Sequence, residues 1–245
     1  MNFAFIAQQN YILERITVRE GIYYASRLKN AANTDHKALV DDVIERLLLQ
    51  NCADNRPFNC SGGQLKRVLI AQELVSKPNI LILDEPTSGL DSVTTWQLIN
   101  LLVELTRQTE PVAVVITIHQ PSARLFNLLD QIYLLSCEGQ CIYNGPPNTM
   151  INMFNEYGLQ CPQFTNPSDF ALEVAAKEYG GAKLLTLSTI MKIEAMELPE
   201  NKYPIKTNRK YRTLNDIIIL TERYENILDS NKENKMVLLF DGTDG

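Results

Sequence analysis

Residues with the spacing of a phosphate- and metal-binding apparatus lie between positions 59 and 91. Ser61-Gly62-Gly63-Gln64 begins a helix-length stretch, and a later apolar run ends in the adjacent pair Asp84-Glu85. Backbone amides at a glycine-rich helix start bind phosphate, because the helix dipole favours negative charge there. A magnesium ion takes carboxylate oxygens, and an attacking water needs a neighbouring base or orienting group. The spacing predicts part of a nucleotide site, with Asp84 for the metal and Glu85 for the water.

Both motifs also have explanations that need no ligand. Ser-x-x-Gln is a capping box, in which two side chains satisfy two backbone donors at a helix start. For Asp84 and Glu85, the explanation without a ligand is a pair of solvated charges at the end of a strand. Two successive glycines in a first helical turn, however, cost about 1 kcal/mol each relative to alanine. Because a cap gives no reason for that cost, Gly62 and Gly63 favour a ligand that approaches the backbone closely.

Three further residues are weaker candidates. Asp91 follows the acidic pair, where a helix N-cap is an equally good explanation. His119 directly follows the apolar run 112–118, so we expect it at the same sheet edge as Asp84; a structural histidine is the alternative. Gln8 follows the first apolar run and is, by itself, only a loop amide.

The composition excludes several classes of protein. The chain has 245 residues, is 45% hydrophobic and carries a net charge of −6, with no basic block of the kind that binds nucleic acid. Five cysteines and two histidines indicate reduced thiols and not a disulfide framework or a zinc site. The longest strongly apolar run, 112–118, falls well short of the roughly 20 residues that span a bilayer.

Apolar periodicity predicts alternating strands and helices, and hence an α/β fold with a parallel sheet. The expected strands are 3–7, 80–83, 112–118, 131–136 and 140–143, and the expected helices are 17–29, 36–50, 62–76, 91–108, 148–157 and 168–177. Gly139 marks a hairpin between the last two strands. After Gly181 charges of both signs alternate, and residues 178–245 are interpreted as a linker or peripheral tail with one weak helix near 214–227.

Together these residues resemble the nucleotide-binding domain of ATP-binding-cassette (ABC) transporters, most closely the G subfamily of White-type half-transporters. The resemblance covers residues 3 to about 176, and it rests on the segments Leu13–Glu20, Asn59–Gln64, Asp84–Ser92, Thr117–Ser122 and Asn166–Val174. It implies a partial P-loop NTPase domain over residues 1–177, with a helical subdomain at 17–60.

The resemblance also implies a role for each candidate residue, with ATP and Mg²⁺ as cofactors. Gln8 would be the Q-loop glutamine that senses the metal, and the signature that contacts ATP held by a partner subunit would be Ser61, Gly62, Gly63 and Gln64. Asp84 would be the metal ligand and Glu85 the catalytic carboxylate. Asp91 would be part of the D-loop at the dimer interface, and His119 would be the switch histidine that contacts the γ-phosphate.

Partners and location follow from the same resemblance. We expect a second half-transporter subunit, in a homo- or heterodimer, and the membrane domain of a parent protein that couples ATP hydrolysis to export of lipid-like or other small molecules. The place would be the cytoplasmic face of a membrane. One alternative is a shortened regulatory subunit that donates Ser61–Gln64 to an intact half-transporter. Another, a soluble ABC-type ATPase of DNA repair or translation, is disfavoured by the acidic charge and by Asn166–Val174.

One departure from the family pattern is serious. None of the 11 glycines lies in a Gly-x-x-x-x-Gly-Lys-Ser/Thr arrangement, the Walker A loop that holds the β- and γ-phosphates. In the family that segment also supplies the strand between 112–118 and 131–136, and the membrane domain is likewise not evident. We therefore expect an unpaired edge beside strand 131–136, poor stability, and no measurable ATPase activity from this chain alone.

Overall fold

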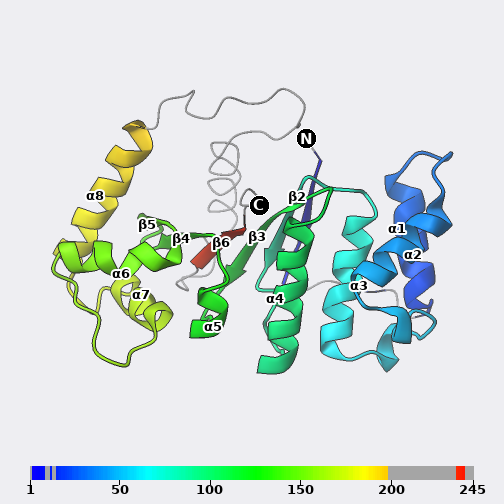
Figure 1. The fold of residues 1–245 in the computed structure, drawn as a ribbon, viewed down its shortest axis with the longest axis horizontal. Helices are drawn as coiled ribbons and strands as arrows, with labels where there is room; N and C mark the ends of the chain where they lie inside the picture. The colour runs from blue at the N-terminus through cyan, green and yellow to red at the C-terminus, as the bar shows by residue number, and fades with distance from the viewer. Residues whose placement is uncertain (1, 9–11, 13–14, 198–235, 241–245) are drawn as a thin grey trace. The chain divides into compact units, whose positions relative to one another are not determined.

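The computed structural model describes residues 2–8, 12, 15–197 and 236–240 (Figure 1). These residues divide into two compact units, one of residues 2–116 and one that begins at Thr117. The division falls inside the strand Ala113–Ile118.

The first unit is built on parallel strands. β1 (Phe3–Ile6) pairs in parallel with β2 (Ile80–Asp84), from Phe3 opposite Ile80 to Ile6 opposite Leu83. β3 (Ala113–Ile118) is the other neighbour of β2, and the three strands run parallel. β2 begins with four apolar residues, of which Ile80, Leu81 and Leu83 are buried, as expected for a strand covered on both faces. The predicted α/β architecture is confirmed.

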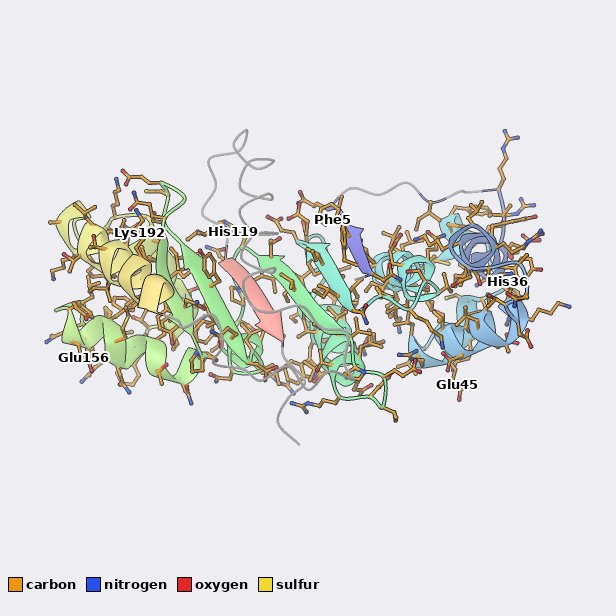
Figure 2. All side chains as sticks on the ribbon, turned by 90° about the horizontal axis from the view of Figure 1, so that it is seen from above. Phe5, His36, Glu45, His119, Glu156 and Lys192 are labelled. Atoms are coloured by element: carbon orange, nitrogen blue, oxygen red, sulfur yellow. The ribbon has the colours of Figure 1, made fainter. Side chains whose placement is uncertain are left out.

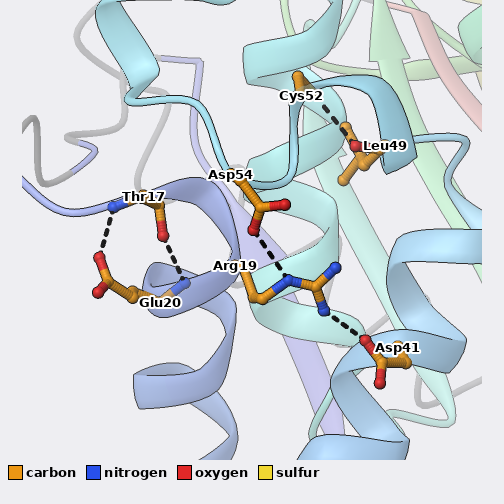
Figure 3. A network of polar contacts seen from close by, with 7 residues as sticks. All are labelled: Thr17, Arg19, Glu20, Asp41, Leu49, Cys52 and Asp54. Atoms are coloured by element: carbon orange, nitrogen blue, oxygen red, sulfur yellow. Dashed lines mark hydrogen bonds and ion pairs between the residues drawn. The ribbon is translucent and has the colours of Figure 1, made fainter.

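Helices cover this sheet. α3 (Gly62–Leu74) contacts β1 and also α4 (Ser92–Thr106), and α1 (Val18–Lys29) packs against α2 (His36–Arg46) and α3. α1 begins with the predicted capping box: the Glu20 amide donates to Thr17 Oγ1 at 3.2 Å, and the Thr17 amide donates to Glu20 Oε2 at 2.8 Å (Figure 3).

The loop that leads to α3 is anchored on α1. Arg19 Nε lies 3.2 Å from Asp54 Oδ1, and the guanidinium also pairs with Asp41 of α2 (Figure 3). The hydrogen bond to Asp41 is the main reason that the pKa of Arg19 is raised, with Asp54 adding to it. The Arg19 amide donates to the Ala53 carbonyl at 2.8 Å. Backbone and side chain together therefore fix the segment that precedes Ser61.

The predicted helix boundary that differs most from the structure is the end of α2. α2 ends at Arg46 and not at Gln50, because Leu48 has φ +52° and reverses the chain. A short 3₁₀ helix, Gln50–Cys52, follows, and a second one, Pro57–Asn59, precedes the cap of α3. Apolar periodicity continues through Leu47 and Leu48 and could not reveal the reversal.

The second unit contains an antiparallel sheet. β4 (Gln131–Leu135) and β5 (Cys141–Gly145) form the predicted hairpin, and Gly139 turns with φ +74°. β6 (Met236–Phe240) pairs antiparallel with β4, from Met236 opposite Leu134 to Leu239 opposite Gln131. The prediction of an unpaired edge beside β4 was wrong, because β6 satisfies that edge.

Four helices surround this sheet. They are α5 (Ala123–Phe126), α6 (Pro147–Glu156), α7 (Pro167–Ala175) and α8 (Gly181–Glu197). α6 and α8 contact β5, α7 contacts β4, and α5 contacts α7. The buried rings of Phe154 and Phe170 lie 6.0 Å apart and join α6 to α7.

α8 was not predicted. It buries Leu184, Leu187 and Met191, which recur at helical spacing within a segment interpreted from its charges as a tail. The weak helix expected near 214–227 lies outside the described residues. The division of the chain at residue 177 stays a prediction. In the described ranges, none of the helices is long and apolar enough to cross a bilayer.

Candidate functional site

The first group of candidate residues gathers where β1 and β2 end. Because the two strands are parallel and Ile6 lies opposite Leu83, the residues after them leave the sheet at one edge. Gln8 Nε2 donates a hydrogen bond to Glu85 Oε2 at 2.9 Å. The structure therefore brings Gln8 beside the carboxyl pair that ends β2. We call Gln8, Asp84 and Glu85 the strand-end site.

Glu85 has an unusual backbone. Its φ is +45°, in the left-handed region that non-glycine residues seldom adopt. The carbonyl of Glu85 accepts a hydrogen bond from the Ser88 amide at 3.1 Å, so a tight turn begins at this residue. Gly89, with φ +76°, follows before α4 begins. Backbone strain of this kind is found at functional sites, where surrounding structure holds it in place.

Lys66 also belongs to the strand-end site, although no role for it was predicted from sequence. Its Nζ donates to the Gln8 carbonyl at 3.2 Å, from the second turn of α3. Burial lowers the pKa of Lys66, while the negative charges of Asp84 and Glu85 act in the opposite direction. The lysine therefore places a positive charge close to two carboxylates. The sequence indicated only that Lys66 lies on a helix. It did not predict that this helix contacts β1.

The donor set fits one kind of metal ion. Within the described ranges, no group of three or more His, Cys, Asp or Glu side chains could hold a metal by itself. Mg²⁺ commonly takes one or two carboxylates and completes its shell with water and substrate phosphate oxygens. Asp84, with the amide oxygen of Gln8, suits a magnesium ion that arrives with a nucleotide.

The second group of candidate residues forms the start of α3, which we call the helix-start site (Ser61–Gln64). The Gln64 amide donates to Ser61 Oγ at 3.3 Å, and the Ser61 amide donates to Gln64 Oε1 at 2.8 Å. The capping box is thus present. Ser61 and Gly62 are nevertheless exposed, and a Cβ on Gly62 would meet only Leu90 Cδ2, at 3.5 Å. Packing within the chain gives no reason for glycine at position 62.

Gly63 has a different reason to be glycine. It is buried, and a Cβ there would lie 2.2 Å from Thr94 Cγ2 on α4. Thr94 is itself fixed, because its Oγ1 donates to Asp91 Oδ2 at 2.6 Å and its amide donates to Asp91 Oδ1 at 3.0 Å. Of the two glycines, Gly63 therefore serves helix packing and Gly62 leaves the backbone open.

Asp91 is the N-cap of α4, which was the alternative interpretation of this residue. The hydrogen bond from the Thr94 hydroxyl is the largest cause of a lowered pKa at Asp91. Asp91 and Thr94 thus connect the turn after the strand-end site with the first turn of the helix-start site.

His119 lies in the second unit, directly after β3, and its side chain is exposed (Figure 2). Its juxtaposition with Asp84, which belongs to the first unit, stays a prediction. The other histidine, His36, has a structural role on α2, where its Nδ1 lies 2.9 Å from Ser26 Oγ.

Two family models match the chain. The model for ABC transporters matches residues 1–88, which contain the strand-end and helix-start sites, and the model for ABC-2 type transporters matches residues 119–235. In the described part of the second range, none of the helices could span a membrane.

Curated relatives agree with these matches. ATP-binding cassette sub-family G member 5 of Homo sapiens is 38% identical over 183 residues, which are 71% of this chain and 27% of the relative. ABC transporter G family member 11 of Arabidopsis thaliana is 35% identical over 231 residues, which are 90% of this chain and 32% of the relative.

Protein white of Drosophila melanogaster is 36% identical over 182 residues, which are 71% of this chain and 26% of the relative. The chain thus spans about a third or less of the length of these curated relatives. The family models, the relatives and the parallel sheet all agree. The chain belongs to the ABC transporter family, and its similarity is to the G subfamily.

Proposed function

We propose that this chain is the nucleotide-binding segment of a G-type half-transporter, whose parent couples ATP binding and hydrolysis to transmembrane export of lipid-like or other small molecules. The observation that carries the proposal is the hydrogen bond between Gln8 and Glu85 beside Asp84, at the carboxyl edge of parallel strands. Open α/β sheets bind their ligands at that edge.

Each group in the two sites has a chemical task in this proposal. Asp84 and the Gln8 amide hold Mg²⁺ together with the nucleotide phosphates, and Glu85 orients the attacking water. Magnesium, when bound, neutralises charge that develops on the phosphates. Ser61 and Gly62 are exposed at the positive end of α3, and this helix start binds the γ-phosphate of ATP held by a partner subunit. His119 would contact the γ-phosphate of the nucleotide that Asp84 and Glu85 serve.

The partner is a second half-transporter subunit, identical or different, and the location is the cytoplasmic face of a membrane. The helix-start site supports this assignment, because Ser61 and Gly62 are exposed. The membrane domain of the parent would be the other partner.

A second candidate function is a regulatory subunit that donates Ser61–Gln64 without hydrolysing ATP. The complete helix-start site favours it, since these residues hold their position through bonds within the first turn of α3. The two candidates differ in what Glu85 does once this chain is paired with an intact half-transporter: turnover of the pair that Glu85→Gln in this chain lowers supports hydrolysis with this chain's carboxylate, and turnover that Glu85→Gln leaves unchanged supports the regulatory role.

The proposal is tested by ATP-dependent association of the full chain with an intact G-type half-transporter, measured by pull-down with and without Mg-ATP. Gly62→Glu places a carboxylate where phosphate would bind, and position 62 has room for it beyond a 3.5 Å contact with Leu90. Asn155→Glu adds the same charge on the exposed surface of α6 and is the matched control.

We expect ATP to strengthen association of the wild-type and Asn155→Glu chains, and Gly62→Glu to lose at least about tenfold of that gain, because like charge would replace a phosphate contact. Equal association of all three chains with and without ATP would contradict the proposal.

A further inference from the structure

The segment Asn166–Val174 contains two donors to one carbonyl oxygen. Ser168 is fully buried, and its Oγ donates a hydrogen bond to the Pro121 carbonyl at 2.7 Å. Asn166 Nδ2 donates to the same oxygen at 3.4 Å. Pro121 lies two residues after His119, so the start of α7 holds the loop that begins at the histidine. None of the roles proposed above uses these bonds.

The two donors sit on a firmly held element. Asn166 is the N-cap of α7, and its Oδ1 accepts the Ser168 amide at 3.3 Å. Pro167 occupies the first turn, where its fixed φ suits a helix start. Phe170, one turn further on, is completely buried, and α7 contacts both β4 and α5. The position of the donors is therefore set by the core of the second unit.

The chain between the held carbonyl and His119 has little freedom. The pyrrolidine ring fixes φ of Pro121, and the residue before a proline, here Gln120, is restricted to extended conformations. On the other side, Ser122 caps α5, with its Oγ accepting the Leu125 amide at 3.4 Å. Fixing the Pro121 oxygen consequently limits where the His119 backbone can lie.

We propose that Ser168 is a positioning residue for His119, assisted by Asn166, and that it acts through the Pro121 carbonyl. The role of His119 toward the nucleotide rests on the proposed function, but its placement by Ser168 does not. The start of α7 would then transmit movements of the second unit to the histidine.

Two variants remove the donors separately. Ser168→Ala deletes the shorter hydrogen bond, and Asn166→Asp deletes the longer one while keeping an oxygen for the cap of α7. Ser188→Ala is the matched control: Ser188 is also buried, at 1% exposure, but its hydroxyl donates to the Leu185 carbonyl of its own helix at 2.9 Å.

The measurement uses the full chain without nucleotide. Amide hydrogen exchange reports on His119 and Gln120, and the imidazole signals in NMR spectra report on the ring, with His36 of the first unit as the internal reference because the chain has two histidines. A merely structural role for Ser168 would not move the His119 ring signal selectively.

We expect Ser168→Ala to speed exchange at His119 and Gln120 by about fivefold, the effect of one net hydrogen bond, and to shift the His119 signal while His36 stays in place. Asn166→Asp should act in the same direction but less, and Ser188→Ala should do neither. Unchanged exchange and ring signals in both variants, or the same changes in Ser188→Ala, would overturn the proposal. If Ser168→Ala does not fold, Asn166→Asp decides alone. Failure of ATP-dependent association would overturn the proposed function, but it would not change the hydrogen exchange and NMR results, which are measured without nucleotide.

Discussion

The helix-start site and the strand-end site are built on different principles. Ser61 and Gln64 bond each other across three residues, whereas Gln8 and Glu85 meet across 77 residues of sequence. The first site presents backbone amides and needs only the local start of a helix. The second gathers charges and amides that the sheet brings together. A local site thus stays formed when its ligand is absent, while a site assembled from distant charges depends on packing and on a compensating cation.

The neighbours of each site show the same contrast. The helix-start site is aligned by an apolar contact, between Gly63 and the methyl group of Thr94. The strand-end site is accompanied by a cation, since Lys66 bonds to Gln8. Burial lowers the pKa of Lys66, and the charges of Asp84 and Glu85 oppose that shift. Substitution of Gly63 should therefore change the free energy of unfolding, and substitution of Lys66 should change the affinity for cations.

The largest effect is expected for Gly63→Ala. The new methyl group would meet Thr94 Cγ2, which cannot turn away cheaply because two hydrogen bonds to Asp91 hold its residue. Overpacking of this kind costs about 1–3 kcal/mol of unfolding free energy. Urea unfolding measures the loss.

Gly62→Ala is the control for this prediction, because its Cβ has room and alanine favours a helix. Thr94→Ser, which removes the methyl group but keeps the hydroxyl, should restore the Gly63→Ala chain. If Gly63→Ala and Gly62→Ala unfold at the same urea concentration, packing does not explain Gly63.

Lys66→Met should raise the affinity of the strand-end site for divalent cations. Removing a positive charge beside Asp84 and Glu85 favours a divalent cation, and a charge interaction near a protein surface is worth on the order of 1 kcal/mol or more. We expect about tenfold tighter binding of Mn²⁺, a spectroscopic substitute for Mg²⁺, in a titration followed by electron paramagnetic resonance. Lys37→Met, on the exposed surface of α2, is the control and should leave the affinity unchanged.

The smallest effect concerns acid stability. The Thr94 hydroxyl is the main cause of the lowered pKa of Asp91. The ionised Asp91 carboxylate therefore stabilises the fold above its unfolded-state pKa near 3.8, and this contribution is lost as the pH falls through the lower folded-state value. Thr94→Val removes that hydroxyl. The variant should lose less stability than the wild type between about pH 4 and pH 2. Parallel curves for both chains in urea unfolding at several pH values would refute this assignment.

Local features were the predictable ones. The capping boxes at Thr17 and Ser61 involve residues three positions apart, and both were predicted from sequence and confirmed. The order of strands and helices through α4 was likewise readable, because apolar runs and proline punctuate it. The family resemblance implied that Gln8 lies near the carboxylates. The structure shows how they meet, through the hydrogen bond from Gln8 to Glu85.

The remaining features depend on contacts between distant segments. Lys66 reaches Gln8 across 58 residues, and no spacing in the sequence signals this. The packing of Gly63 against Thr94 needs the crossing of α3 and α4. α8 was missed for another reason: its leucines do have helical spacing, but the surrounding charges obscured the pattern. Pairing of β6 with β4 brings together strands about a hundred residues apart and lies beyond local patterns.

The central claim is that the helix-start site serves ATP held by another subunit. It is tested most directly by mixing the full chain with a full-length G-type half-transporter whose own signature has been disabled by mutation, and measuring ATP hydrolysis. We predict that the chain alone shows no measurable turnover, that the mixture regains it, and that Gly62→Glu abolishes the gain while Asn155→Glu does not. A mixture that stays inactive with the wild-type chain, or turnover by the chain alone that Glu85→Gln removes, would contradict the account.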